Sequence, residues 1–165
     1  MKIFKIILLN LIVFLFNCGV YTFSGSTLPS HIKTVDIPLF ANQSLMPNIA
    51  EELTQELTKQ VISMNLLSVA SSKGDATIKG KVLNYSNEPR TFQTSSARQI
   101  NVSEYVVKIT VDVEFIDNKK GSAIYKGKIT GEGVYDFKSQ TEEIGKKSAE
   151  KDVVQQILQN SLQSW

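Results

Sequence analysis

The stretch 103–117, SEYVVKITVDVEFID, decides the fold class of this chain. Every odd-numbered position from Val107 to Phe115 is apolar, and every position between them is lysine, threonine, aspartate or glutamate. Because successive side chains of a strand point to opposite faces, this alternation predicts a strand with one buried and one solvated face. Strands of this kind are typical of antiparallel sheets.

The residues that follow predict a hairpin. Residues 118–121, NKKG, are typical of a turn in which Gly121 adopts a positive φ. Residues 122–137 then return as the next strand. Three glycines share the apolar face of this return strand: Gly127, Gly131 and Gly133. Glycines at such positions indicate that a covering helix approaches closely or that the strand bends.

The residues upstream predict further strands. Residues 76–85 alternate in the same way, and the polar residues 86–100 are expected to form a long connection. Residues 66–70 are a candidate for a short strand. A first strand is expected within 31–40, with three apolar side chains on one side: Val35, Ile37 and Leu39.

Two segments predict amphipathic helices. Residues 47–65 repeat apolar side chains every three to four positions, with Asn48 as the expected N-cap. Residues 139–165 do the same, with Ser139 as the expected cap. The stripe of the second helix is expected to contain Ile144, Val153, Val154, Ile157, Leu158, Leu162 and Trp165.

The order strand, helix, three strands, helix predicts an α+β domain over residues 31–165. Each helix has one apolar stripe, and the sheet has one apolar face. The economical arrangement is a two-layer sandwich, with both helices on one face of a mixed, mostly antiparallel sheet of about four strands.

The N-terminus differs from the rest in composition. After Lys2 and Lys5, residues 6–16 contain ten apolar residues in eleven. As a helix this run would cover only about 16 Å, half of the ~30 Å hydrocarbon core of a membrane. The pattern favours a signal peptide over residues 1–17, with a permanent anchor helix or a buried helix as the alternatives.

Cys18 is the only cysteine of the chain and follows this apolar run directly. A disulfide would need a second cysteine, and Cys18 has no histidine or cysteine nearby with which to bind a metal. Its place resembles the bacterial lipoprotein signal, in which the thiol is lipidated and becomes the mature N-terminus. Residues 18–30 are then a lipidated N-terminus and tether. A plain secretory signal with a chance cysteine is the alternative.

The charge balance gives little indication of a partner. The chain has 18 basic and 16 acidic residues, and its first seventeen residues contain two lysines and no acid, so 16 of each remain. Binding to nucleic acid therefore has no support in composition.

The sequence contains no recognisable catalytic motif that would indicate an enzyme. His31 is the only histidine and is interpreted as a surface residue. No G-x-S-x-G motif is present, and GDATIKGK, residues 74–81, has the wrong glycine spacing and no following Ser or Thr for a phosphate loop. We expect no catalytic residue, no metal site and no cofactor.

The start of the predicted mature chain suggests a family. The sequence NCGVYTFSGSTLPSHIKTVDIPLFANQSLMPNIAEELTQELTKQ, residues 17–60, resembles the lipopolysaccharide-assembly lipoproteins known as LptE. The matching features are the Cys-Gly start, the spacer with Pro29, the Ile32–Pro38 segment, and Asn42 shortly before an amphipathic helix. The similarity is specific through about residue 60, and beyond that it rests on the order of elements.

The resemblance implies a role and a location. Members are lipid-anchored in the outer membrane, face the periplasm or a barrel lumen, and lie inside a large β-barrel partner. The pair inserts lipopolysaccharide into the outer leaflet. A scaffold or pilot lipoprotein of another envelope complex, without glycolipid contact, is the alternative from a different class.

Basic side chains are the candidates for contact with lipopolysaccharide or the partner. Phosphates favour charge-assisted donors, and arginine can hold them in a bidentate manner. Arg90 and Arg98, the only arginines, therefore rank first. Four lysines on the solvated faces of the predicted strands rank below them: Lys79, Lys81, Lys126 and Lys128. An ordinary solvated sheet face would explain these lysines equally well.

Overall fold

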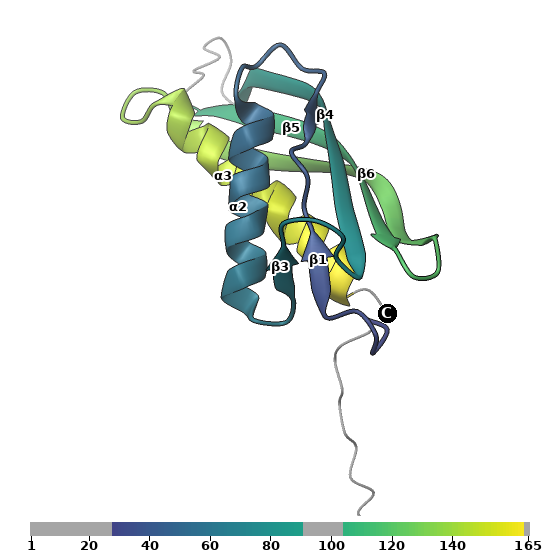
Figure 1. The fold of residues 1–165 in the computed structure, drawn as a ribbon. Coiled ribbons are helices and arrows are strands. Elements are labelled where there is room, and N and C mark those ends of the chain that lie inside the picture. The colour runs from purple at the N-terminus through teal and green to yellow at the C-terminus, as the bar shows by residue number, and fades with distance from the viewer. Residues whose placement is uncertain (1–27, 91–103, 164–165) are drawn as a thin grey trace, which may run out of the picture.

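The computed structural model describes residues 28–90 and 104–163 of the chain (Figure 1). The short elements of the first half are the strands β1 (Thr34–Asp36), β2 (Ala41–Asn42) and β3 (Ser68–Ala70) and the helix α2 (Ile49–Met64). The long strands are β4 (Ala76–Arg90), β5 (Glu104–Asp117) and β6 (Ser122–Asp136). The C-terminal part is the helix α3 (Glu142–Leu158), which continues as one π-helical turn, η1 (Gln159–Gln163).

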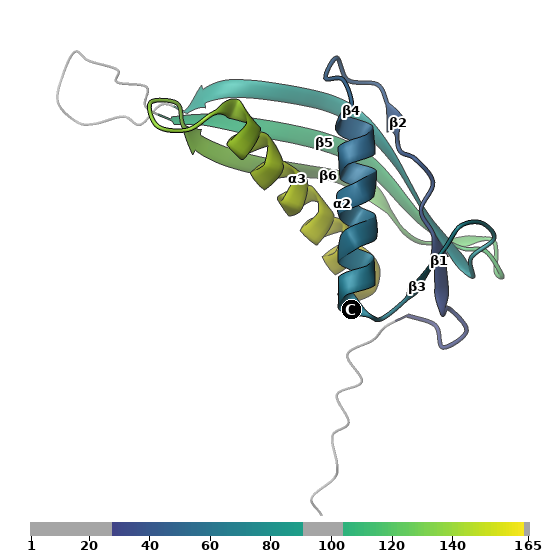
Figure 2. The same ribbon diagram turned by 60° about the vertical axis from the view of Figure 1, so that its left-hand side comes forward.

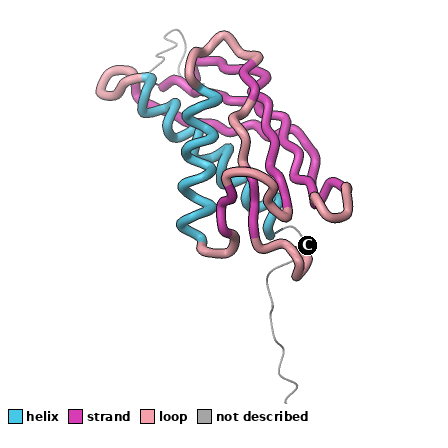
Figure 3. Tube along the Cα trace, viewed as in Figure 1, coloured by secondary structure: helices cyan, strands magenta, loops and turns pink. Residues whose placement is uncertain are grey.

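The strands form one mixed sheet in the order β3-β1-β4-β5-β6, and β2 pairs with β4 beside β1. The short strand β1 runs parallel to both β3 and β4, whereas β4, β5 and β6 are antiparallel. Both helices lie on the same side of this sheet (Figures 2 and 3). The predicted α+β two-layer sandwich is therefore confirmed. The sheet has six strands rather than about four, because β2 and β3 add two very short ones.

The stretch 103–117 forms the central long strand, as its alternation predicts. The side chains of Val107, Ile109, Val111, Val113 and Phe115 are all at most 1% exposed. They face α2 and α3, whose buried side chains, among them Leu53, Leu57 and Val153, complete a single apolar core. The other face of β4, β5 and β6 carries the polar side chains.

The glycines of β6 bring α3 into direct contact with the sheet. A Cβ atom on Gly131 would lie 2.6 Å from the backbone oxygen of Ala149, and one on Gly133 would collide with the backbone of Gly145 and Ala149. The expected close approach of a helix is thus confirmed. At the other end of the hairpin Gly121 has a φ of 67°, as the turn requires.

The first strand differs from its prediction. The strand ends at Asp36, before Pro38, and Leu39 is 63% exposed. Phe40 takes the expected place of Leu39 in the core, where it is 3% exposed and its ring covers Gly80. A proline cannot donate a ladder hydrogen bond, so pairing stops there and the chain turns until Phe40 faces inward.

The expected polar connection begins later than predicted, because β4 continues to Arg90. Up to Val82 this strand has β1 and β2 on its other side, but beyond that point β5 is its only partner within the part of the chain that the structure describes. It therefore becomes an edge strand, where polar residues and even Pro89 are tolerated.

The predictions of the helix termini are partly wrong. Asn48 precedes α2, but its φ is 60° and its side chain makes no capping hydrogen bond. Helix α3 begins at Glu142, so Thr141 rather than Ser139 occupies the N-cap position. Ile144 is 47% exposed and is not part of the buried stripe, and Trp165 lies outside the described residues.

Candidate binding face and N-terminal clasp

The open face of β4, β5 and β6 carries two rows of alternating charge. In each row a lysine of β4 pairs with a carboxylate of β5, which pairs with a lysine of β6. The rows are Lys79–Glu114–Lys126 and Lys81–Asp112–Lys128. In the first row the Lys126 Nζ lies 3.4 Å from Glu114 Oε1. Because lysines outnumber carboxylates in both rows, this end of the open face is cationic.

A hollow of about 450 Å³ lies beside these rows. Its lining combines the apolar Pro38, Leu39 and Ala41 with charged side chains of β4, β5 and β6, including Lys79 and Lys81. The exposed Leu39 thus lies next to ammonium groups. This arrangement can hold a ligand that has an anionic group and an apolar part.

The arginines are not part of this cluster. Arg90 ends β4, nine residues beyond Lys81, so the two lie about 30 Å apart along the strand at ~3.3 Å per residue. Its Nη1 is 3.8 Å from Glu104 Oε2. The structure therefore brings together Lys79, Lys81, Lys126 and Lys128 and separates them from Arg90. Arg98 lies outside the described residues.

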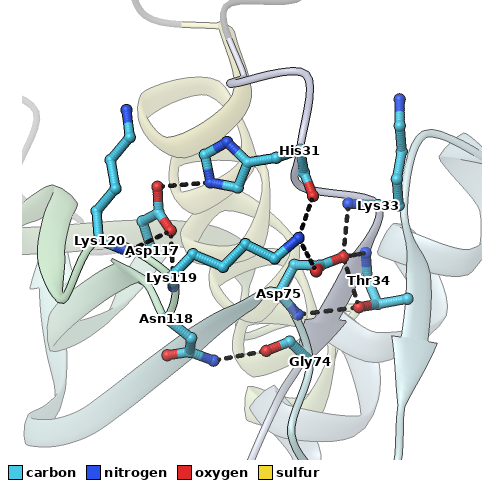
Figure 4. A network of polar contacts seen from close by, with 9 residues as sticks. All are labelled: His31, Lys33, Thr34, Gly74, Asp75, Asp117, Asn118, Lys119 and Lys120. Atoms are coloured by element: carbon cyan, nitrogen blue, oxygen red, sulfur yellow. Dashed lines mark hydrogen bonds and ion pairs between the residues drawn. The ribbon is translucent and has the colours of Figure 1, made fainter.

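A polar network, here called the N-terminal clasp, joins the start of the described chain to the sheet (Figure 4). Its members are His31, Thr34, Asp75, Asp117 and Lys119. The His31 Nε2 lies 2.8 Å from Asp117 Oδ2. The Lys119 Nζ lies 2.9 Å from Asp75 Oδ1 and also donates to the backbone oxygen of His31 at 3.3 Å.

Asp75 is the most heavily bonded member of the clasp. Its Oδ2 accepts hydrogen bonds from the backbone N–H of Lys33 and Thr34 and from the Thr34 hydroxyl, at 2.9–3.1 Å. The ammonium of Lys119, followed by these donors, holds the pKa of Asp75 well below its usual value. Asp75 therefore stays ionised and fixes the residues just before β1.

Asp117 ties the same segment to the β5–β6 turn. Its Oδ1 accepts from the backbone N–H of Lys119 and Lys120, at 2.9 and 3.1 Å. Burial acts to raise the pKa of Asp117, but hydrogen bonds from His31 and from these amides outweigh it and lower the pKa. His31, interpreted from the sequence as a surface residue, has a side chain that is 28% exposed and is paired with Asp117.

A second charged group lies between the helices. This interhelical cluster consists of Glu52 on α2 and Glu143, Lys146 and Glu150 on α3. The Lys146 side chain is 7% exposed, and its Nζ lies 2.8 Å from Glu52 Oε2 and 3.0 Å from Glu143 Oε2. Burial acts to lower the pKa of Lys146, but its two carboxylate partners outweigh it and raise the pKa.

Glu150 is the least satisfied member of the interhelical cluster. Burial, followed by a hydrogen bond and charge repulsion from Glu52, raises the pKa of Glu150 to about 8. Its Oε1 has no hydrogen-bond partner among the described residues. The protonated form of Glu150 is therefore favoured over the ionised form more than in an exposed glutamate. The sequence shows Lys146 only as a neighbour of Glu142 and Glu143, so nothing in it points to the contact with Glu52.

Among residues 28–90 and 104–163, no group of three or more His, Cys, Asp or Glu side chains is placed to hold a metal ion. Within those ranges no helix has the length and apolar character needed to cross a membrane.

The open charged face, the clasp and the sandwich belong to a segment with a recognisable family pattern. The sequence model of the family "LptE: Lipopolysaccharide-assembly" matches residues 32–161. The chain belongs to the LptE family. The match spans the described domain from just before β1 into η1, so the resemblance drawn from the N-terminal motifs is confirmed. A search of curated proteins found no match to the sequence.

Several solved structures are similar to this LptE-family chain at low sequence identity. A hypothetical protein from Chlamydia trachomatis has a TM-score of 0.55 at 9% identity, over 79% of this chain and 98% of that one. The PelC dodecamer subunit from Paraburkholderia phytofirmans has a TM-score of 0.51 at 16% identity, over 84% and 95%. Lipoprotein B from Nitrosomonas europaea is 24% identical over 79% and 81%, with a TM-score of 0.46.

Proposed function

We propose that this protein is a lipid-anchored subunit of the lipopolysaccharide transport machinery of the outer membrane. It acts with a large β-barrel partner to insert lipopolysaccharide into the outer leaflet. The observation that carries this proposal is the family match over residues 32–161. The organisation that we propose is a signal peptide over residues 1–17, a lipidated tether over 18–30 with the lipid on Cys18, and one domain over 31–165. As is expected for this family, we assign no catalytic activity.

The two faces of the sheet support this role. One face is covered by both helices and is dry, so the domain does not depend on a partner for its core. The other face is charged and has no covering layer among the described residues (Figure 2). A charged, uncovered face suits a protein that is surrounded by the polar interior of a barrel.

The partner is tested by co-purification from native membranes in mild detergent. Affinity-tagged protein is expected to bring down a large β-barrel of the lipopolysaccharide pathway, identified by mass spectrometry. Recovery of a different envelope complex, from protein that binds no glycolipid, would instead support the scaffold alternative.

The anchor is tested separately with Cys18→Ala. We expect this variant to lose palmitate labelling and to leave the outer-membrane fraction, because two or more acyl chains are needed for stable anchoring. Cys18→Ser also lacks the thiol and is expected to give the same result. A Cys18→Ala protein that is still labelled and still sediments with the outer membrane would exclude lipidation at this residue.

Direct contact with glycolipid needs two variants, because the structure divides the basic candidates into two groups. The pair Arg90→Glu with Arg98→Glu changes the far end of β4 and the segment after it. The pair Lys79→Glu with Lys81→Glu changes the cationic rows beside the hollow. Each is assayed for lipopolysaccharide binding by the purified full chain and for barrel co-purification.

The outcomes separate glycolipid contact from partner contact. A pair that contacts glycolipid loses binding while the barrel still co-purifies, and wild-type binding weakens as salt is raised. Loss of the barrel alone assigns the pair to the protein interface. Unchanged glycolipid binding in both double variants excludes all four residues from the site.

A further inference from the structure

The outward backbone groups of β6 have hydrogen-bond partners over only half of the length of the strand. Among the described residues, this strand has β5 on one side and no strand on the other. Three side chains bond to its outward backbone near its C-terminal end. Asp152 Oδ2 accepts from the N–H of Glu132 at 2.9 Å, and Gln156 Nε2 donates to the oxygen of Thr130 at 3.1 Å. Gln140 Oε1 accepts from the N–H of Asp136 at 2.9 Å.

These bonds show which backbone groups point outward. In a strand the N–H and C=O of one residue point to the same side, and that side alternates along the chain. Because Thr130, Glu132 and Asp136 point away from β5, Lys126 and Lys128 do so as well. No hydrogen bond to these outward groups is present within residues 28–90 and 104–163. The reason is the path of α3, which crosses the sheet obliquely and leaves the β5–β6 hairpin uncovered (Figures 1 and 2).

We propose that the edge of β6 at Lys126 and Lys128, beyond the register shift that precedes Tyr125, binds an extended segment of another polypeptide, which adds to the sheet as a further strand. Such strand addition uses main-chain hydrogen bonds for affinity and side chains at alternate positions for specificity. Here the segment carries two acidic side chains, two residues apart, opposite Lys126 and Lys128. The proposal is independent of the lipopolysaccharide role.

The charge pattern of the open face specifies the acidic side chains. Each row runs from lysine to carboxylate to lysine and ends at the edge of β6 on an exposed lysine. Opposite charges directly across a strand pair are favourable, and like charges are unfavourable. On the inner side, β5 presents Asp112-Val113-Glu114 to β6, so the outer segment is its counterpart with the pattern acid, apolar, acid.

The chain itself offers no such segment outside the described elements. Residues 1–27, 91–103 and 164–165 contain no aspartate or glutamate. A second copy is disfavoured as the occupant in the register centred on Gly127, because antiparallel pairing of two β6 edges there would place Lys126 opposite Lys128. Lysines on an edge prevent self-association in this way. The same lysines therefore disfavour another copy in this register and accept an acidic strand.

The first test measures binding of a fluorescein-labelled peptide, Thr-Val-Asp-Val-Glu-Val-Thr, to the full chain in mild detergent. The control peptide has lysine in place of both acidic residues. We expect binding of the acidic peptide only, with slower hydrogen exchange at the amides of Lys126 and Lys128. No saturable binding, or protection confined to another part of the chain, would overturn the proposal.

The second test exchanges the charges. Lys126→Glu with Lys128→Glu should weaken binding of the acidic peptide by about tenfold or more and should allow the lysine peptide to bind. The matched control is Lys79→Glu with Lys81→Glu, which alters the same two rows on β4. Equal loss of peptide binding in both double variants would show a general charge effect and not strand addition.

The third test removes one backbone donor. Lys128→Ala removes the charge but keeps the outward N–H, whereas Lys128→Pro also removes the N–H. The bonds to β5 are made by the residues on either side, so proline is tolerated at this edge position. We expect weaker binding for proline than for alanine. Equal binding by two variants with native circular dichroism would contradict the proposal, and if the proline variant does not fold, the hydrogen-exchange result on the wild type decides.

Discussion

The two faces of the long strands are built from the same alternating sequence but meet different requirements. On the covered face, Ile109, Val111 and Val113 are dry and the backbone of α3 lies directly on Gly131 and Gly133. On the open face, lysines and carboxylates alternate in rows that water can reach. The covered face depends on the shape of every group in it. The open face depends on the charge of its side chains and not on close packing, so its residues can be substituted without loss of the fold.

The largest effect is expected from a charge placed under α2. Leu57→Asp puts a carboxylate at a side chain that is 0% exposed, at a cost on the order of 5 kcal/mol, which is comparable to the whole stability of a domain. We expect residues 26–165 to unfold cooperatively in urea and the variant to show no transition. Gln55→Asp, on the exposed side of the same helix, is the control. A cooperative transition in the Leu57→Asp protein would show that this stripe does not face the core.

A smaller loss is expected where helix and sheet backbones touch. Gly133→Ala adds a Cβ against the backbone of Gly145 and Ala149, which cannot move independently, and should lower the free energy of unfolding by roughly 2–4 kcal/mol. The control is Gly127→Ala, whose Cβ would meet only the far end of the Tyr125 side chain, with the hydroxyl oxygen at 2.7 Å and Cζ at 3.2 Å, and no backbone atom. Urea titration of both variants checks this, and equal losses would contradict it.

The interhelical cluster is expected to make stability depend on pH. Folding raises the pKa of Glu150 to about 8 from its ordinary value of 4.5, so the folded state holds a proton that the unfolded state releases. The contribution of Glu150 to stability therefore falls as pH rises from about 4.5 to about 8 and is constant above. Glu150→Gln keeps a neutral donor for Glu52 and should be more stable than the wild type at pH 8, by roughly 1–3 kcal/mol.

The check is thermal unfolding of both proteins at pH 5 and pH 8. The difference in stability between Glu150→Gln and the wild type should nearly vanish at pH 5, because Glu150 is then protonated in the folded state. The nearby Lys146 does not change this. Glu51→Gln, which removes an exposed carboxylate one residue from Glu52, serves as the control. An unchanged difference at both pH values would show that Glu150 does not take up a proton on folding.

The smallest effect is expected on the open face. Asp112→Asn removes the carboxylate between Lys81 and Lys128 and should change the free energy of unfolding by less than ~0.5 kcal/mol, because exposed ion pairs contribute little. Urea titration at low and high salt measures it. If Asp112→Asn lowered the free energy of unfolding as much as Gly133→Ala, the open face would be as sensitive to substitution as the covered face.

The long strands could be predicted because their residues are governed by a local rule. Alternation from Val107 to Phe115 and the turn at Gly121 need no knowledge of the partner strands. The short strands were harder, because β2 has only two residues and Phe40, not Leu39, enters the core. Which of the two side chains enters the core depends on where strand pairing stops near Pro38, and contacts between distant parts of the chain decide this.

The candidate site divides in the same way. Side-chain alternation predicted that Lys79, Lys81, Lys126 and Lys128 lie on a solvated face, and the register of the sheet then arranged them in rows. The clasp joins His31 to Asp117, 86 residues apart in the chain. Neither residue carries a local signal for the other, so only the fold reveals the pair.

The clasp has a mechanical consequence for a chain that is held at its N-terminus. A pull along β1 would load the bond of His31 to Asp117 and the bonds of Thr34 to Asp75 together with the buried side chain of Ile32, which lies between them in the chain. Behind them, β1 is paired with β3 and β4 on its two sides, so a force along the strand loads the hydrogen bonds of both pairs together rather than one at a time. A force on the N-terminal tether would thus be distributed over the hydrogen bonds of β1 to both neighbouring strands. The open face and the edge of β6 would stay in place.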